Sequence, residues 1–314
     1  MKNIKIIENN SELGAGTRGA SLGIEAIKLA SLKLNSNFFY GKITEKVVTH
    51  NELLFAPNKY KYAKRIDGIA RVYQNHSAKI KKLYDGNPMI ILGADHSVGG
   101  ATVAGLKLAN PDKTIGVIWI DAHGDLHSPY TSPSGNIHGM PLAIALGEDN
   151  KECAVNSVDK ETEYYWNLLK EIGGICPKIH PENLIFFGVR DTEPQEDELI
   201  NRLNIKNFKV EECRQKGLEN CVQEALTMLN GCDLIHVSFD VDSMDTSISV
   251  GTGTPVPGGF YLEEAKNLIT KLIQHPKINT FELVEVNPLL DTNNKMAEVA
   301  FEIVETVYQI FEKK

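Results

Sequence analysis

The chain has 314 residues, of which 42% are hydrophobic and 24% charged, with a formal net charge of −8 at pH 7, as expected for a globular protein with an ample core. This acidic balance argues against a surface that follows nucleic-acid phosphates, so we expect no nucleic-acid partner. The five cysteines include no CxxC pair, and no run approaches the roughly 20 apolar residues of a membrane span, so we expect reduced thiols, a cytoplasmic location and no membrane partner.

Short apolar runs that end in polar residues alternate with helical patterns along most of the chain. The apolar runs predict strands at residues 4–8, 89–92, 116–120, 184–191, 234–242 and 281–287. Apolar residues at intervals of three and four predict helices at residues 24–34, 60–84, 98–109, 218–229 and 262–274. Strands that alternate with helices indicate an α/β fold with a mostly parallel central sheet and helices on both faces.

Two stretches interrupt this alternation. Residues 14–23 form a glycine-rich segment whose spacing matches neither GxGxxG nor the Walker A pattern, so we interpret it as a structural turn. Residues 148–181 are polar, and we interpret them as an insertion with one helix at 161–172, because a structureless loop of that length is improbable in a compact domain. We treat residues 1–314 as one domain.

Polar side chains gather at the ends of three predicted strands. These candidates are His96, Asp121, His123, Asp125, Asp240 and Asp242. Asp121, His123 and Asp125 are spaced two residues apart, as are Asp240 and Asp242, so the members of each set would point to one side of an extended chain. Taken singly, an Asp at the end of a strand most often caps the following helix. A single His there is more often a hydrogen-bonded surface or core residue than a metal ligand. Their joint occurrence at three strand ends predicts a shared metal site.

Two imidazoles and four carboxylates exceed the three or four protein ligands that one zinc site usually takes. Two divalent cations would balance the four carboxylates, whereas one would leave uncompensated charge in a low-dielectric cleft. An oxygen-rich set with one histidine per ion suits Mn²⁺. A water that bridges two such ions is acidic enough to act as hydroxide near neutral pH, so the sequence predicts a metal-activated hydrolase.

Six segments together resemble the ureohydrolase family in order and spacing, and the arginases more than the agmatinases. They are GADHS (93–97), DAHGD (121–125), SGNIHG (134–139), SFDVD (238–242), GTGTPVPGG (251–259) and EVNP (285–288). The resemblance implies a three-layer α/β/α fold, a binuclear manganese centre and a homo-oligomer, either a trimer or a hexamer. It also implies hydrolysis of a guanidino substrate, L-arginine being converted to L-ornithine and urea.

The resemblance also implies roles for individual residues. His96 would ligate the first ion, and His123 and Asp242 the second. Asp121, Asp125 and Asp240 would complete or bridge the two shells, and Asp125 would also hold the attacking hydroxide. The other positions that match the family motifs are Glu285 as the guanidinium anchor, His138 as the proton shuttle and Thr254 as a residue that lines the guanidinium pocket.

The positions that would bind the α-amino acid end of the substrate match the family less well. Ser132, Ser134, Asn136 and Glu196 are compatible with it. His127 stands where the family usually has Asn, and Glu193 where it usually has Asp. These two changes keep a second interpretation open, a ureohydrolase that acts on agmatine, guanidinobutyrate, guanidinopropionate or formiminoglutamate. A non-catalytic family member is a third interpretation, which nothing favours because every matched chemical position is filled.

Overall fold

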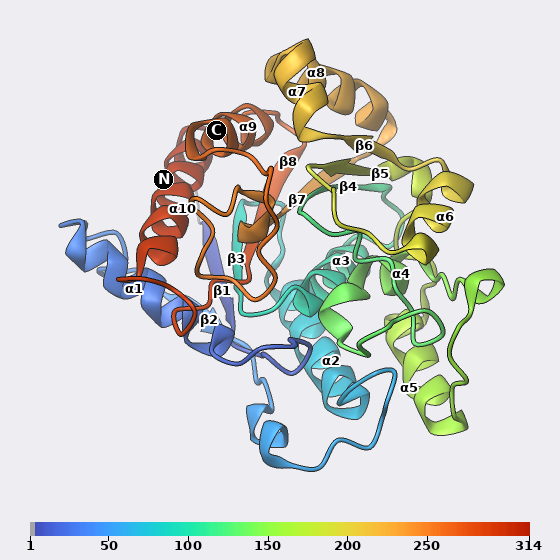
Figure 1. Ribbon diagram of the computed structural model, residues 1–314. Coiled ribbons are helices and arrows are strands. Elements are labelled where there is room, and N and C mark those ends of the chain that lie inside the picture. The colour runs from blue at the N-terminus through green and yellow to red at the C-terminus, as the bar shows by residue number, and fades with distance from the viewer. Residues whose placement is uncertain (1–3) are drawn as a thin grey trace.

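Eight strands form one sheet in the order β2-β1-β3-β8-β7-β4-β5-β6, and every pairing between neighbours is parallel. The structure is a computed structural model that describes residues 4–314 (Figure 1). The strands are β1 Lys5–Asn9, β2 Thr44–Lys46, β3 Met89–Gly93, β4 Ile115–Ile120, β5 Leu184–Phe187, β6 Lys206–Phe208, β7 Leu234–Asp240 and β8 Ile278–Val284. The predicted α/β class with a mostly parallel sheet is confirmed.

Helices cover both faces of the sheet, which gives three layers (Figure 1). One face carries α1 Gly23–Lys33, α7 Val210–Lys216, α8 Leu218–Met228, α9 Leu262–Ile273 and α10 Lys295–Lys313. The other carries α2 Ile66–Leu83, α3 Ser97–Ala109, α4 Pro141–Leu146 and α5 Lys160–Lys170, with α6 Pro194–Leu203 beside them. Helices on both faces are what an all-parallel sheet requires, because its crossovers place them there.

Side chains alternate along the strands between two hydrophobic cores. Ile90 and Ile118 pack in the core beneath α1, α9 and α10, whereas Ile91 and Trp119, their neighbours in the chain, pack in the core on the other face. This period of two explains why the central strands are nearly uninterrupted apolar runs, since both of their faces are buried.

The structure differs from the sequence-based prediction at some element boundaries. The helix predicted at 60–84 begins only at Ile66, because Arg65 adopts a left-handed backbone conformation with φ 57° through which an α-helix cannot pass. The edge strands β2 and β6 were not predicted. Each has three residues, and their sequences, TEK and KNF, lack an apolar run.

Residues 148–181 contain the helix expected there, at Lys160–Lys170. The carboxylate of Asp159 accepts hydrogen bonds from the first-turn amides of this helix, as an N-cap does. Trp166 is fully buried, and its Nε1 donates to Asp149 Oδ1 at 2.7 Å. The segment is therefore packed against the body of the protein, where α5 contacts α2 and α4.

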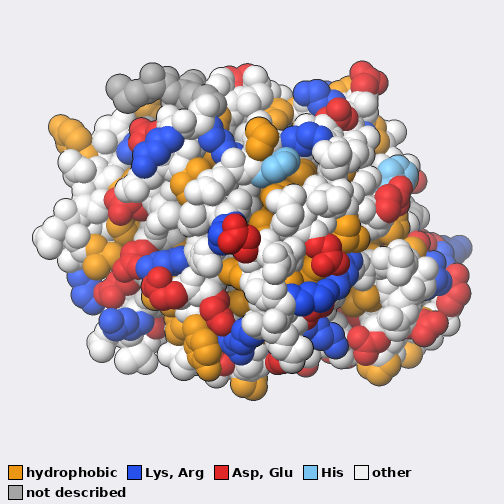
Figure 2. All heavy atoms as spheres, turned by 90° about the horizontal axis from the view of Figure 1, so that it is seen from above, with side chains coloured by type: hydrophobic (Ala, Val, Ile, Leu, Met, Phe, Trp, Pro, Cys, Tyr) orange, Lys and Arg blue, Asp and Glu red, His pale blue; other side chains and the backbone are white. Residues whose placement is uncertain are grey.

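The surface is mixed in character. On the face seen in Figure 2, acidic and basic side chains are interspersed and apolar side chains occur in small groups. Within residues 4–314, none of the helices combines the length and the apolar character that crossing a membrane would require.

Candidate metal centre and pocket

Four neighbouring strands in the middle of the sheet, β3, β8, β7 and β4, bring the candidate residues together. His96 follows β3, Glu285 follows β8, Asp240 ends β7 and Asp121 follows β4. Since all four strands are parallel, their carboxyl ends meet at one edge of the sheet, which is where open α/β sheets bind ligands. Residues far apart in the chain thus reach one small volume.

The loop after β4 brings side chains into this volume from an extended segment and from a turn. Asp121 Oδ1 and His123 Nδ1 lie 3.5 Å apart, as the two-residue spacing predicted. Asp125 does not continue the extended pattern, because its backbone is left-handed with φ 53°. The turn nevertheless brings its Oδ2 to 3.2 Å from His96 Nδ1.

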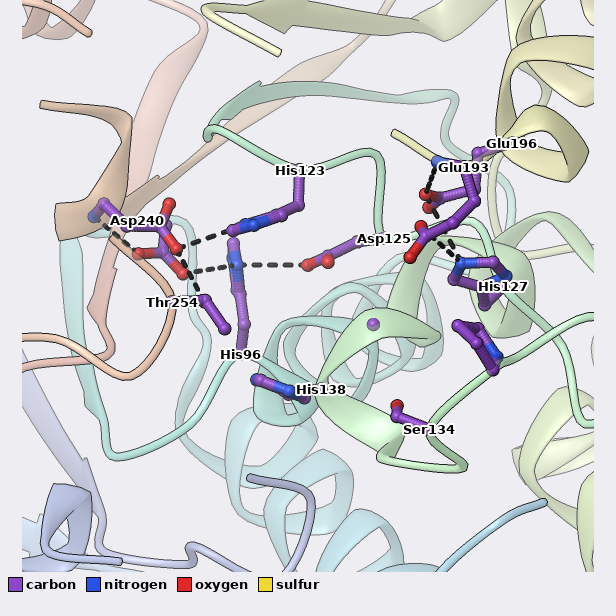
Figure 3. A pocket seen from close by; sticks show the side chains of 13 residues that line it. His96, His123, Asp125, His127, Ser134, His138, Glu193, Glu196, Asp240 and Thr254 are labelled. Atoms are coloured by element: carbon purple, nitrogen blue, oxygen red, sulfur yellow. Dashed lines mark hydrogen bonds and ion pairs between the residues drawn. The ribbon is translucent and has the colours of Figure 1, made fainter. Parts of the chain in front are cut away.

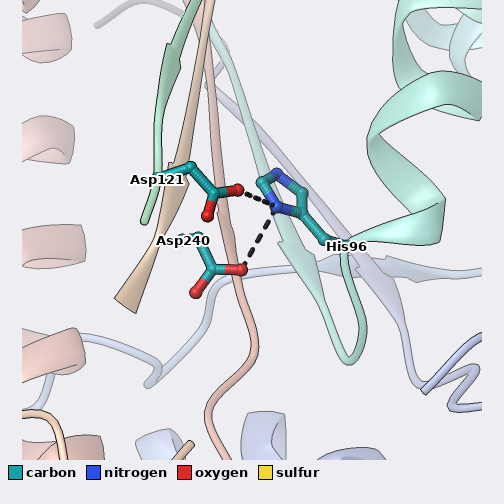
Figure 4. Close-up of side chains that lie close together, drawn as sticks. All are labelled: His96, Asp121 and Asp240. Atoms are coloured by element: carbon teal, nitrogen blue, oxygen red, sulfur yellow. Dashed lines mark ion pairs between the residues drawn. The ribbon is translucent and has the colours of Figure 1, made fainter. Parts of the chain in front are cut away.

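Two clusters of ligand atoms share one residue. In the first, His96 Nδ1 lies 2.8 Å from Asp121 Oδ2 and 3.2 Å from Asp240 Oδ2 (Figure 4). In the second, His123 Nδ1 lies 3.2 Å from Asp242 Oδ2 and 3.5 Å from Asp121 Oδ1. Asp121 therefore offers one carboxylate oxygen to each cluster. This arrangement fits two cations that share a bridging carboxylate.

The chemistry of these groups also fits cations. His96 Nδ1 and Asp125 Oδ2 are buried and make no hydrogen bond. Burial and the negative charge of Asp121 raise the pKa of Asp125 well above its ordinary value. Burial and the charges of Asp242 and Asp121 do the same to the pKa of Asp240. Bound dications would relieve this repulsion and satisfy both unpaired atoms.

Residues behind His96 fix its orientation. Ser238 Oγ donates to Glu282 Oε2 at 3.1 Å and lies 2.8 Å from His96 Nε2. Since the single hydroxyl proton goes to Glu282, Ser238 accepts the Nε2 proton of His96, which leaves the Nδ1 lone pair for a cation. The Trp119 ring stacks on the imidazole with centroids 3.9 Å apart, and Trp119 Nε1 donates to Asp121 Oδ2 at 3.0 Å.

The sequence-based analysis assigned no role to Ser238, Glu282 or Trp119. A usable signal was present for two of them, since Ser238 and Glu282 are polar residues inside otherwise apolar strands and would be costly to bury unpaired. They lie directly opposite each other in the pairing of β7 with β8.

Replacing Ser238 by alanine is expected to weaken metal binding about 10–100-fold, the usual cost of losing a partner behind a ligating histidine. The physical reason is that His96 Nε2 would keep a buried, unpaired proton and the ring would lose its fixed orientation. Titration of the metal-stripped protein with Mn²⁺ measures the effect. Ser77→Ala, which removes another buried hydroxyl from helix α2, is the control. An unchanged dissociation constant for Ser238→Ala would contradict the assignment.

A cavity opens above the two clusters (Figure 3). Five carboxylates contribute to its wall and, among the described residues, no lysine or arginine does. The lining residues are His96, His123, Asp125, His127, Pro133, Ser134, His138, Gly139, Glu193, Glu196, Asp240, Asp242 and Thr254. A pocket with this excess of negative charge favours a cationic ligand.

Two of the residues expected at the α-amino acid end of the substrate are not part of this wall, and neither is Glu285, the expected guanidinium anchor. Ser132 is buried, and its Oγ accepts a hydrogen bond from Gly135 N at 2.9 Å. Asn136 Oδ1 accepts from Lys64 Nζ at 3.0 Å. Both side chains thus make contacts within the surrounding loops.

Glu285 and His138 form a pair beside the metal-ligand clusters. Glu285 Oε1 accepts from the His96 backbone amide at 2.9 Å and lies 3.1 Å from His138 Nδ1. Burial alone lowers the pKa of His138, but the hydrogen bond to Glu285 raises it overall to about 9. Glu285 has φ 68°, a strained conformation for a residue other than glycine, as is often seen at functional sites. Thr254 Oγ1 donates to Asp242 Oδ2 at 3.2 Å.

His127, Glu193 and Glu196 lie together at the outer end of the pocket (Figure 3). His127 Nε2 is 2.9 Å from Glu193 Oε2 and 3.5 Å from Glu196 Oε2. The hydrogen bond with His127 lowers the pKa of Glu193 to about 2, whereas burial raises the pKa of Glu196 to about 7. Glu193 therefore stays ionised to lower pH than Glu196 does.

The comparisons with known proteins agree with this geometry. The model of the family described as "Arginase family" matches residues 2–309. The arginase of Bacillus subtilis (strain 168) is 34% identical, with 98% of this chain and 97% of that protein covered, and the arginase of Staphylococcus aureus (strain COL) is 35% identical with the same coverage. The solved native structure of Bacillus caldovelox arginase superposes with a TM-score of 0.81 at 31% identity, covering 98% of each chain. The chain belongs to the arginase family.

Proposed function

We propose that this protein is a manganese-dependent arginase, which hydrolyses L-arginine to L-ornithine and urea. The observation that carries the proposal is the pair of clusters bridged by Asp121 at the floor of an acidic pocket. Membership of the arginase family and identities of 34–35% over nearly the whole length to the arginases of two bacteria support it.

Two Mn²⁺ ions would be held by His96, Asp121, Asp125, Asp240, His123 and Asp242. Such a pair would supply a hydroxide nucleophile at neutral pH by lowering the pKa of a bound water. The oxygen-rich ligand set, with one histidine in each cluster, supports manganese over metals that prefer nitrogen or sulfur ligands. Asp125 would ligate a cation through Oδ2, which is buried and free of hydrogen bonds, and its other carboxylate oxygen would accept the hydrogen of the nucleophile and orient it.

Side chains beside the clusters would position the substrate and transfer the proton. A guanidinium has a pKa far above neutral pH and stays charged, so its carbon is a poor electrophile unless it is held against the nucleophile. Glu285 would accept hydrogen bonds from the guanidinium, a charge-assisted contact that fixes its position. His138, whose pKa is raised by its hydrogen bond to Glu285, would give a proton to the departing amine nitrogen.

The outer end of the pocket would bind the α-amino acid group of the substrate. Glu193 and Glu196 offer carboxylates to an α-ammonium, and Ser134 and His127 offer hydrogen-bond donors to an α-carboxylate. His127 already pairs with Glu193 at 2.9 Å. This pair favours a second candidate, a ureohydrolase whose substrate carries a different group at that end.

Rates of product release by the Mn²⁺-loaded protein from several substrates test this proposal. We expect L-arginine to have the highest kcat/KM among L-arginine, agmatine, 4-guanidinobutyrate and 3-guanidinopropionate, followed as urea, and formiminoglutamate, followed as formamide. The reason is that only L-arginine combines the guanidinium with both groups that the outer residues can bind. A higher kcat/KM for any of the others would replace the first candidate with the second.

We further propose a single-domain, cytoplasmic homo-oligomer, a trimer or a hexamer. The packing of α1 against α10, from opposite ends of the chain, supports one domain. Five free cysteines are consistent with a reducing compartment. Tyr40, Ile43 and Phe55 are more than 80% exposed, and an interface between subunits would cover such apolar side chains.

A further inference from the structure

His127, Glu193 and Glu196 resemble the two clusters at the base of the pocket in the spacing of their ligand atoms. One nitrogen and two carboxylate oxygens lie within 4.8 Å of one another in each of the three groups. The nitrogen-to-oxygen distances are 2.9 and 3.5 Å here, against 2.8 and 3.2 Å around His96. This outer cluster shares no residue with the other two.

The surroundings of the outer cluster hold two of its ligands in place. His127 Nδ1 lies 3.1 Å from Thr131 Oγ1, a hydroxyl oxygen that can accept the Nδ1 proton, and Nε2 faces the two carboxylates. A ligating histidine is usually fixed by such a hydrogen bond from its other nitrogen.

Glu196 is fixed as firmly as His127. Its Oε1 accepts from Leu126 N at 3.1 Å, and its Oε2 accepts from Glu193 N at 3.3 Å. A side chain at Gly124 would come within 2.9 Å of Oε1, so the loop after β4 packs directly on the carboxylate. Its buried oxygens are therefore preorganised opposite the imidazole, while Glu193 remains half-exposed.

We propose that His127, Glu193 and Glu196 form a third divalent-cation site at the outer end of the pocket. One imidazole and two carboxylates supply the three protein ligands that zinc takes in open sites, and the remaining position faces the cavity. Zn²⁺ is a suitable probe for the site, because at a given set of nitrogen and oxygen ligands it binds more tightly than Mn²⁺. The cation would replace the proton that His127 Nε2 shares with Glu193, and it would use the lone pair of that nitrogen and the charge of both carboxylates.

Occupation of this site would exclude the cationic end of an amino acid substrate, because the same carboxylates cannot bind an ammonium and a dication together. Zn²⁺ bound there would therefore act as an inhibitor that competes with substrate. This consequence rests on the proposed function, whereas the binding of the cation does not.

Counting the metals bound to the full chain tests the site without any turnover. The protein is loaded with Mn²⁺, mixed with one further equivalent of Zn²⁺, separated from free metal and analysed for both elements. We expect a total of about three ions per chain. In His127→Asn and in Glu193→Gln, which alters a half-exposed side chain and leaves the core intact, we expect a total of about two and a loss of Zn²⁺ affinity of at least about 10–100-fold.

His180→Asn, the same change at an exposed histidine outside the pocket, is the matched control and should keep the third ion. A total of two ions in the unaltered protein, with each Zn²⁺ bound replacing one Mn²⁺, would overturn the proposal and leave His127 as a hydrogen-bond donor only. Retention of the third ion by both His127→Asn and Glu193→Gln would overturn it as well. If the protein loaded with Mn²⁺ alone did not turn over L-arginine, while three ions were counted after Zn²⁺ was added, only the proposed function would be contradicted.

Discussion

Replacing Asp121 by asparagine is expected to abolish measurable urea release, with a fall in kcat/KM of at least about 10³-fold. This loss should exceed the roughly 10–100-fold cost of removing a partner behind a metal ligand, because Asp121 offers one oxygen to each cluster. The amide keeps the volume of the carboxylate but removes the charge that two cations share. Metal analysis should show fewer than two ions per chain.

Asp112→Asn, the same substitution at an exposed position, controls for the change in net charge and should leave activity and metal content unaltered. Circular dichroism of Asp121→Asn should match the parent, since the buried shape is conserved. If Asp121→Asn kept two ions and full activity, the carboxylate would not bridge the clusters.

Replacing Glu285 by glutamine is expected to lower kcat/KM about 10²-fold or more while both metal ions stay bound. Removing one partner of a buried, hydrogen-bonded charge pair costs about 2–5 kcal/mol, and Glu285 is only 2% exposed. The neutral amide would lose the ionic contact with the guanidinium. It would also lose the contact that raises the pKa of His138.

Steady-state kinetics and metal analysis on the same preparation separate these effects from a loss of metal. Glu312→Gln, on the exposed side of the last helix, is the control and should behave as the parent does. Unchanged kcat/KM in Glu285→Gln would remove this residue from the substrate site. A parallel loss of both metal ions would make it a structural support of the ligand clusters.

The position of the ligand set could be predicted because the geometry of parallel strands is general. Polar residues just after the apolar runs at 89–92 and 116–120 had to lie at one edge of the sheet, and the same held for Asp240. The two-residue spacing of Asp121 and His123 predicted that the two side chains lie beside each other, because Asp121 directly follows β4. The residue types and the direction of the strands were sufficient to predict where these side chains meet.

Other parts of the site depend on contacts that no local pattern specifies. Asp125 reaches His96 through a left-handed turn, which breaks the alternation of an extended chain. The partnership of Ser238 with Glu282 depends on the pairing register of β7 with β8. Asn136 was expected to contact the substrate. In the structure its Oδ1 accepts a hydrogen bond from Lys64, which lies 72 residues earlier in the chain.

The most direct measurement of the central claim is the reconstitution of activity from metal-free protein. The chain is stripped with a chelator, titrated with Mn²⁺ and assayed for urea and L-ornithine from L-arginine. The account predicts no turnover without metal, full activity only when about two ions are bound per chain, and equal amounts of the two products. Full activity in the metal-free protein, or saturation of activity at one ion per chain, would contradict it.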